Sequence, residues 1–241
     1  MPFKIRSIQL LLSAPLALIG SMLHARPAFQ MSKYMPGLLF RPHTEPNWRP
    51  ANQFSTCELD PQQRIWLLDD GSLTGRLISS NSGHFSVERL HQSWSRAHLS
   101  EQTVLAIRQR QRVLVREVVL KINDTPVVFA RSLFPVGSLS GRLRHLRHLR
   151  NRSLGSILFR FPQMQRSPFE IARIAGNSAY LPAFLQQSSP AWGRRSCFTI
   201  DGRRLLVSEV FLQNFKPWQA VLPLHRSQRG KVNAAILQAK Q

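Results

Sequence analysis

Cysteine is nearly absent from this chain. Two cysteines, Cys57 and Cys197, stand far apart among 241 residues and show no metal-ligand spacing. A disulfide framework of the kind that holds small secreted domains together is therefore excluded, and so is a cysteine-based zinc motif. We expect two reduced thiols in a reducing compartment.

Acidic residues are also scarce. Lys and Arg number 33 against 12 Asp and Glu, which gives a formal net charge of +21. Such a balance suggests nucleic acid or an anionic membrane surface as a partner. Much of the excess lies in residues 142–152, where leucines at helical spacing lie under a basic surface, so the simplest interpretation is the solvated face of a helix. Electrostatic steering of an anionic substrate is the alternative.

Nucleic-acid-binding motifs are missing. Aromatic side chains do not alternate with the basic run as stacking platforms would, and there is no zinc-finger, homeodomain or RNP motif. We therefore expect no nucleic-acid partner.

The chain also lacks the common catalytic and metal-binding motifs. It contains no Ser/His/Asp triad order, no His-Glu-x-x-His helix and no Gly-rich phosphate loop. His84, His91 and His98 recur at intervals of seven, but no carboxylate completes a ligand set, and we assign them no role. The sequence predicts no metal site.

One carboxylate stands in a segment that otherwise has the pattern of a core strand. Strand periodicity after the hairpin signal Asp201-Gly202 places Glu209 on one face with Leu205, Val207 and Phe211. A buried carboxylate costs several kcal/mol unless it is paired, protonated or bound to a ligand. Glu209 is therefore predicted to be part of an ion pair or of a binding site.

A second predicted strand carries the opposite charge. Arg116 shares a face with Leu114, Val118 and Leu120. Two interpretations remain open: Arg116 and Glu209 neutralise each other in the core, or together they orient a small hydroxy acid. In the second, the arginine fork binds the carboxylate and Glu209 accepts a hydrogen bond from the hydroxyl.

The secondary-structure pattern predicts an α+β fold. Strands are expected at 85–90, 113–122, 127–134, 198–200 and 205–212, with hairpins at 123–124 and 201–202. Helices are expected at 59–68, 101–108, 141–150 and 169–175. Hairpin-linked strands with separate helices indicate a single domain with an antiparallel β-sheet, covered on both faces by helices or flaps.

Six short segments, in this order and spacing, resemble the chorismate lyase family. They are WLLDDGSLTGRL at 66–77, VREVVL at 115–120, FARS at 129–132, SLG at 153–155, WGRRS at 192–196 and LVSEVFL at 206–212. No single segment is diagnostic, but their ordered set is. The resemblance implies a chorismate lyase-like domain in which flaps cover the ligand.

The resemblance also implies an activity and a set of site residues. Family members convert chorismate into 4-hydroxybenzoate and pyruvate, at the start of the ubiquinone ring pathway, without metal or organic cofactor. The residues carried over are Arg116 for the product carboxylate, with the backbone amides of Leu73 and Leu139, and Glu209 for the product hydroxyl. Leu73 replaces a methionine found in at least one member, which leaves a backbone contact intact.

The same resemblance is compatible with a second functional class. The effector domains of one repressor class have a similar fold, so the alternative is a non-catalytic domain that binds a small aromatic acid. Such a repressor would need a winged-helix reader before the effector domain. The residues before Trp66 are too irregular and proline-rich to form one.

Three regions divide the chain. We expect an N-terminal extension at 1–50, the chorismate lyase domain at 51–215 and a basic tail at 216–241, with an inserted surface loop at 175–191 that could alter a lid. The extension begins with an apolar run at 8–23, which is read as a signal peptide, an over-extended reading frame or a weak membrane association. Because chorismate is made in the cytoplasm, we expect a cytoplasmic enzyme. We also expect a monomer.

Overall fold

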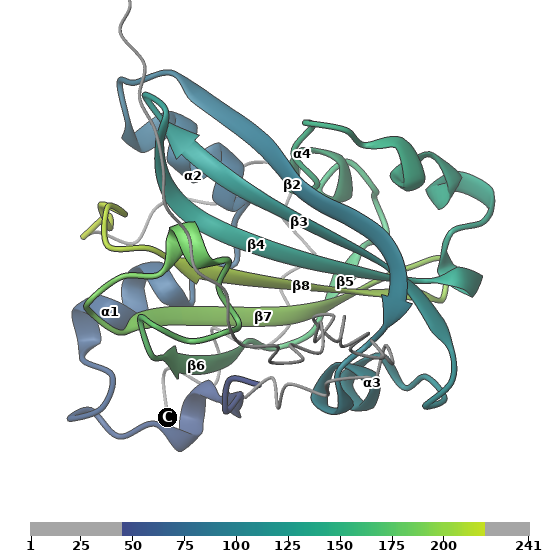
Figure 1. The fold of residues 1–241 in the computed structure, drawn as a ribbon, viewed down its shortest axis with the longest axis horizontal. Helices are drawn as coiled ribbons and strands as arrows, with labels where there is room; N and C mark the ends of the chain where they lie inside the picture. The colour runs from purple at the N-terminus through teal and green to yellow at the C-terminus, as the bar shows by residue number, and fades with distance from the viewer. Residues whose placement is uncertain (1–44, 220–241) are drawn as a thin grey trace, which may run out of the picture. The chain divides into compact units, whose positions relative to one another are not determined.

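A computed structural model describes residues 45–219 of the chain (Figure 1). The predicted apolar run, most of the N-terminal extension and most of the basic tail lie outside the described residues. Residues 45–219 form an antiparallel sheet with a few short helices, so the predicted α+β class is confirmed.

Eight strands form the sheet in the described part of the chain, and every pair is antiparallel. They run in the order β1-β6-β7-β8-β4-β3-β2, with β5 paired to β7. The strands are β1 (Arg49–Pro50), β2 (Phe85–Arg96), β3 (Arg112–Ile122), β4 (Thr125–Pro135), β5 (Gln165–Arg166), β6 (Glu170–Ile174), β7 (Ala191–Ile200) and β8 (Arg203–Phe211).

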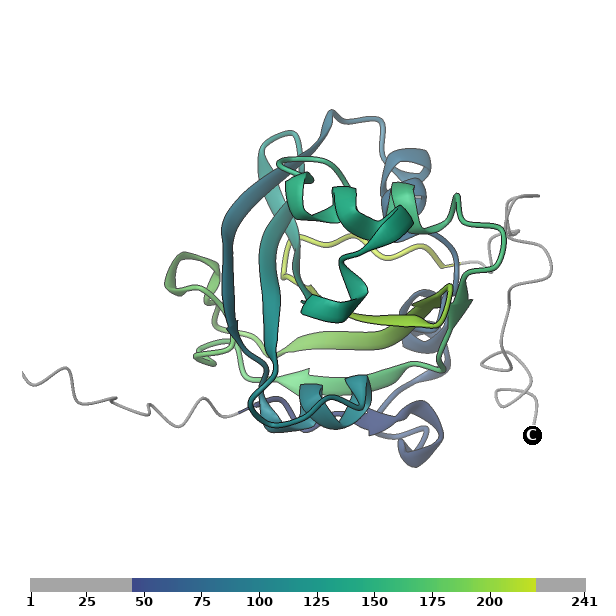
Figure 2. The same cartoon turned by 90° about the vertical axis from the view of Figure 1, so that its right-hand side faces the viewer.

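Short helices connect and cover these strands. The α-helices are α1 (Pro61–Leu67), α2 (Leu73–Ser80), α3 (Leu99–Leu105) and α4 (Gly155–Leu158), and the 3₁₀ helices are η1 (Ala51–Gln53), η2 (Val136–Ser138), η3 (Gly141–His148) and η4 (Ala183–Leu185). Figure 2 shows the sheet curving around the η3 and α4 segment, while α3 lies on the outer side. No helix among residues 45–219 is both long enough and apolar enough to cross a membrane.

Both predicted hairpins are confirmed. Asn123 and Asp124 have φ angles of 48° and 61°, and Asp201 and Gly202 have φ angles of 49° and 73°. Positive φ at both central residues is the signature of the type I′ turn, whose twist matches that of the flanking strands. The first turn joins β3 to β4 and the second joins β7 to β8.

The helix predicted at 169–175 is wrong, because this segment forms strand β6. Ile171 and Ile174 lie three residues apart, as on a helix face, but Ile171 packs on the inner face of the sheet and Ile174 on the outer face. A short apolar run cannot be assigned by periodicity alone. Pairing with β7 decides the outcome.

The predicted helix at 141–150 forms as the 3₁₀ helix η3. Leu143, Leu146 and Leu149 are buried at intervals of three, which matches the three residues per turn of this helix type. The arginines between them remain on the surface, except Arg147, which is partly buried. The predicted basic helix face is thus present with a tighter winding.

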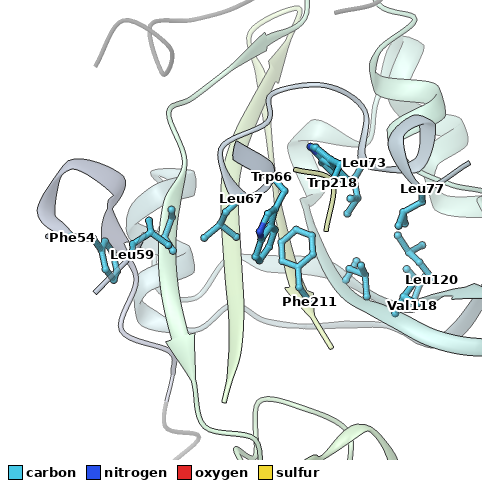
Figure 3. Packing of buried hydrophobic residues seen from close by; sticks show 14 residues of the cluster. Phe54, Leu59, Trp66, Leu67, Leu73, Leu77, Val118, Leu120, Phe211 and Trp218 are labelled. Carbon is cyan, nitrogen blue, oxygen red and sulfur yellow. The ribbon is translucent and has the colours of Figure 1, made fainter. Parts of the chain in front are cut away.

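The core divides between the two faces of the sheet. On the inner face, residues from α1, α2, β3 and β8 form one apolar cluster, in which the Trp66 and Phe211 ring centroids lie 4.8 Å apart (Figure 3). A second inner cluster joins the leucines of η3 to α4 and β7. These clusters leave a cavity between them, and the site lies there.

The outer face carries a row of polar residues in register across five strands. Glu117, Arg131, Ser208, Arg195 and Glu170 stand opposite one another on β3, β4, β8, β7 and β6. Arg131 and Arg195 each form an ion pair at 2.7 Å with the glutamate beside them. The two buried arginines of this row are therefore each compensated by a neighbouring carboxylate.

The predicted insertion at 175–191 is an ordered surface loop that includes η4. Tyr180 and Leu181 pack against the outer-face cluster, and the amide of Gln187 donates to the carbonyl of Gly176 at 2.9 Å. A side chain at Gly176 would lie 2.1 Å from the carbonyl oxygen of Gln187, so this close approach requires glycine. The loop therefore covers the face opposite the cavity.

Candidate active site

A cavity lies on the inner face of the sheet, between β3, β4 and β8 on one side and α2 and residues 153–159 on the other. Atoms leave about 520 Å³ empty within it, including its opening to solvent. The hydrogen bond of 2.5 Å between the hydroxyls of Thr74 and Ser153 joins the two covering segments. Its lining is largely apolar, with charged groups contributed by Arg116, Arg166 and Glu209.

Arg116 reaches this cavity from the middle of β3. Its side chain is 1% exposed, and its Nη2 donates to the backbone carbonyls of Arg150 and Arg152 at 3.0 and 2.8 Å. Nε of Arg116 is buried and has no hydrogen-bond partner in the described part of the chain. Burial and the nearby Arg89 lower the pKa of Arg116 to about 10, so it stays charged at neutral pH. A buried charge with an unused donor is suited to an anion.

Glu209 is paired with Arg194, a residue that was not among those predicted for the site. Nε of Arg194 donates to Oε2 of Glu209 at 2.7 Å. The interpretation in which Arg116 and Glu209 neutralise each other is therefore wrong. Both residues line the cavity instead. Strand alternation in the WGRRS segment could have identified Arg194, because it stands opposite Glu209 on β7 and faces the same side.

Arg194 also fixes the segment that follows α1. Its Nη1 donates to the carbonyl oxygens of Trp66, Leu67 and Asp69 at 3.3, 3.2 and 2.7 Å. The last carbonyls of a helix carry partial negative charge and lack partners within the helix, so a guanidinium there is stabilising. One buried side chain thus links Glu209 to the loop that leads into the cavity wall.

The loop that follows α1 leads to helix α2, which begins at Leu73. Ser72 is the N-cap, and its hydroxyl accepts from the amide of Gly75 at 3.3 Å. Leu73 is the first residue of the helix and lines the cavity. Amides in the first turn have no partner within the helix and lie at the positive end of its dipole. The surroundings of the Leu73 amide therefore favour an anion.

Leu139 lies elsewhere. It is not among the residues that line the cavity, and its amide donates to the carbonyl of Val136 at 3.2 Å within a tight turn. Its side chain is 1% exposed in the cluster formed with η3 and α4. Of the four residues predicted for the site, the structure brings together Leu73, Arg116 and Glu209.

Arg166 is a cavity residue that sequence reasoning missed. It ends the two-residue strand β5, which carried no strand signal, and its side chain is buried. Nε donates to the hydroxyl of Ser196 at 2.8 Å and Nη1 to the carbonyl of Asp70 at 3.1 Å. Burial and the neighbouring Arg194 lower the pKa of Arg166 to about 9. It remains a cation at neutral pH.

No metal centre accompanies these groups within residues 45–219. There, no three His, Cys, Asp or Glu side chains are grouped closely enough to hold a metal ion. His91, one of the three histidines spaced by seven, is exposed and lies 2.7 Å from the hydroxyl of Ser93. The geometry instead offers two cations and a carboxylate around an apolar cavity, which can orient a small anionic ring compound.

Comparison with known proteins gives the same family along most of the chain. Residues 44–221 match the family model described as chorismate lyase. A protein of Nitrosomonas europaea named "Probable chorismate pyruvate-lyase" is 39% identical over 169 residues, which cover 68% of this chain and 92% of that protein. One of the same name from Aromatoleum aromaticum is 38% identical over 180 residues, covering 71% of this chain and 94% of that protein.

Solved structures show a more distant likeness. The effector domain of PhnF from Mycobacterium smegmatis aligns with a TM-score of 0.47 and 17% identity, over 64% of this chain and 95% of that one.

Proposed function

The chain belongs to the chorismate lyase family, and on this premise we propose that it converts chorismate into 4-hydroxybenzoate and pyruvate. The observation that carries the proposal is the placement of Arg116 and Glu209 in one largely apolar cavity. The reaction would supply the ring of ubiquinone. We place it in the cytoplasm, where chorismate is made.

The chemistry demands geometry rather than a reactive group. The carbon–oxygen bond to the enolpyruvyl group breaks, and its electron pair stays on the departing oxygen. The neighbouring hydroxyl-bearing carbon loses its proton, and that electron pair completes the aromatic ring. The methylene carbon of the departing group takes up this proton, so the proton balance closes within the substrate and the departing group becomes pyruvate. Aromatisation drives the reaction, so fixed positions and charge stabilisation are sufficient for catalysis.

Each cavity residue has a role in this proposal. Arg116 binds the ring carboxylate through its unused Nε donor, and the Leu73 amide at the start of α2 adds a second donor. Glu209 accepts a hydrogen bond from the ring hydroxyl, held in place by Arg194. The amide of Leu139 donates to the carbonyl of Val136, so the role expected from the family resemblance would require this turn bond to open.

We further propose that the enzyme needs no metal or organic cofactor and acts as a monomer. The reaction includes no net oxidation or reduction and no activated group, so the substrate itself supplies what the chemistry requires.

Purified protein mixed with chorismate tests the function directly. We expect 4-hydroxybenzoate and pyruvate in equal amounts, at the same rate with and without EDTA. Binding of 4-hydroxybenzoate with no turnover would instead identify a non-catalytic aromatic acid-binding domain. Loss of activity with EDTA, restored by a divalent ion, would contradict the cofactor-independent mechanism.

A further inference from the structure

Arg166 has no role in the reaction described so far, yet it is built into the cavity. Its guanidinium is fixed by Ser196 and by the carbonyl of Asp70, and it lies over the rings of Phe169 and Phe198 at 4.1 and 4.9 Å. Stacking and hydrogen bonds of this kind hold an arginine in a single orientation. The cation is thus held in place at the edge of the cavity.

The strand register puts Arg166 and Arg116 at opposite sides of the site. Arg116 stands opposite Ser132, Ser132 opposite Val207, and Val207 opposite Ser196, which binds Arg166. Three strand spacings of about 4.8 Å separate the ends of this row by roughly 14 Å along the sheet. The two arginines therefore enter the cavity from opposite ends of this row of strands.

Glu209 lies on the Arg166 side. It pairs with Arg194 on β7, the strand that also carries Ser196, and its charge acts on Arg166. Arg194 itself is committed to Glu209 and to three carbonyls. Arg166 lines the same cavity as Glu209, the proposed hydroxyl-binding group, and the Glu209 charge acts on it.

The proposed substrate has a second carboxylate that needs such a cation. In chorismate the enolpyruvyl ether is attached to the ring carbon next to the one that bears the hydroxyl. If Arg116 holds the ring carboxylate and Glu209 the hydroxyl, the enolpyruvyl group must lie at the Glu209 side of the cavity. Without a counter-ion its carboxylate would be buried unpaired, which is costly.

We propose that Arg166 binds the enolpyruvyl carboxylate of chorismate and stabilises the negative charge that develops on the departing oxygen. This inference rests on the proposed function and adds the group that recognises the leaving part of the substrate. As the carbon–oxygen bond breaks, the departing enolpyruvate gains charge close to the fixed guanidinium, so the interaction strengthens in the transition state. The product 4-hydroxybenzoate lacks this carboxylate and makes no use of Arg166.

Ligand binding to the wild-type protein tests the site without any substitution. The probes are 3-carboxymethoxy-4-hydroxybenzoate, which carries a second carboxylate beside the hydroxyl, and 3-methoxy-4-hydroxybenzoate, which does not. We expect the dicarboxylate to bind about tenfold more tightly or better, as a charged hydrogen bond would give. Equal or weaker binding of the dicarboxylate would overturn the proposal.

Two variants of Arg166 test whether this residue causes the preference for the dicarboxylate probe. In Arg166→Gln, which removes the charge, we expect kcat/KM for chorismate to fall about a hundredfold. In Arg166→Lys we expect a fall of about tenfold, because lysine keeps the charge but lacks the two-pronged guanidinium. Affinity for 4-hydroxybenzoate should stay within about threefold of wild type, because the proposed product contacts with Arg116, the Leu73 amide and Glu209 are unchanged. The preference for the dicarboxylate probe should disappear in Arg166→Gln.

A matched control separates this role from general loss of a buried arginine. Arg195→Lys alters a buried arginine on the opposite face, which pairs with Glu170, and should lower the melting temperature without changing the probe preference. Equal losses of product affinity and turnover in the Arg166 variants would make Arg166 structural and overturn the inference. A wild-type protein that binds both probes but forms no 4-hydroxybenzoate would refute the proposed function instead.

Discussion

Arg194 and Glu209 form the central ion pair of the site, with Nε of the arginine 2.7 Å from Oε2 of the glutamate. Arg194 is 1% exposed, whereas the Glu209 side chain keeps 14% exposure at the cavity that it lines. The pair is therefore asymmetric. Its cation is sealed into the scaffold by the carbonyls after α1, and its carboxylate is presented to the ligand.

Glu209→Gln should reduce turnover far more than stability. The amide keeps an oxygen that can accept from Arg194, and the three carbonyl partners of Arg194 remain, so we expect to lose only about 1 kcal/mol of unfolding free energy. Turnover should fall about a hundredfold or more, because the charge that polarises the ring hydroxyl is gone. Melting temperature and chorismate turnover are measured on one preparation.

The opposite pattern would return Glu209 to a purely structural role. That pattern is a large drop in melting temperature with nearly normal turnover per folded molecule. Glu209→Asp is the matched control, since it keeps the charge but has a shorter side chain. Its melting temperature should stay close to that of the wild type, while its chorismate turnover should fall.

Arg116→Ala should weaken product binding. A charged hydrogen bond is worth about 1.5 to 3 kcal/mol, so affinity for 4-hydroxybenzoate should fall roughly tenfold to more than a hundredfold. Arg116→Lys should be intermediate, because it retains a charge without the fork. Isothermal titration measures both. Unchanged affinity in a folded Arg116→Ala protein would contradict the role of Arg116 as the carboxylate anchor.

The basic surface should accelerate capture of chorismate. Residues 125–169 contain no acidic residue, and Arg142, His145, Arg152 and Arg160 surround an open hollow beside the segment that covers the cavity. A dianionic substrate is attracted over distances set by salt screening. We expect kcat/KM to fall as ionic strength rises while kcat stays nearly constant.

Charge removal checks the origin of this salt effect. Arg142→Gln combined with Arg160→Gln should flatten the dependence of kcat/KM on salt. Arg173→Gln removes an exposed charge from β6, outside the basic stretch, and should leave the dependence nearly unchanged. Identical slopes in all three proteins would support the other interpretation, a solvated face without influence on substrate capture.

Glu101 should govern stability in acid. It is 3% exposed and accepts from Nε of Arg131 at 2.8 Å. Burial alone would raise the pKa of Glu101, but the Arg131 charge and hydrogen bond outweigh it and hold the pKa below the ordinary 4.5. Because the folded-state pKa is the lower one, this stabilisation is present above pH 4.5 and is lost as the pH falls through the folded value.

Glu101→Gln is the corresponding test. At neutral pH the variant should lose about 1.5 to 3 kcal/mol of unfolding free energy, because Arg131 loses its charged hydrogen bonds to Glu101 but keeps the ion pair with Glu117. Below pH 4.5 the difference from wild type should shrink, as measured by urea unfolding at several pH values. A difference that stays constant with pH would contradict the assigned pKa shift.

Local patterns were sufficient for much of the fold. Alternation in the β3 and β8 segments predicted that Arg116 and Glu209 face inward, and the Asn123-Asp124 and Asp201-Gly202 pairs predicted tight hairpins. Such features depend on neighbours in sequence, because strand period and positive φ are properties of a few consecutive residues. Helix α2 was missed, although Ser72 offered an N-cap signal.

Long-range contacts decided the rest. β6 became a strand through its pairing with β7, against a local pattern that also suits a helix. Arg194 and Arg166 are held at the site by hydrogen bonds to the carbonyls of Leu67 and Asp70, which lie more than ninety residues away in sequence. Arginine has a long, flexible side chain, so its sequence position limits only loosely where its charge will lie.

The sequence by itself thus determined which strands bear the inward charges and which family they belong to. Only the tertiary structure decided which charges meet. The sheet register brings Glu209 to Arg194 rather than to Arg116, and leaves both Arg116 and Arg166 at the cavity. The physical reason is that a buried ion pair is chosen by side-chain geometry across several strands, which no local periodicity encodes.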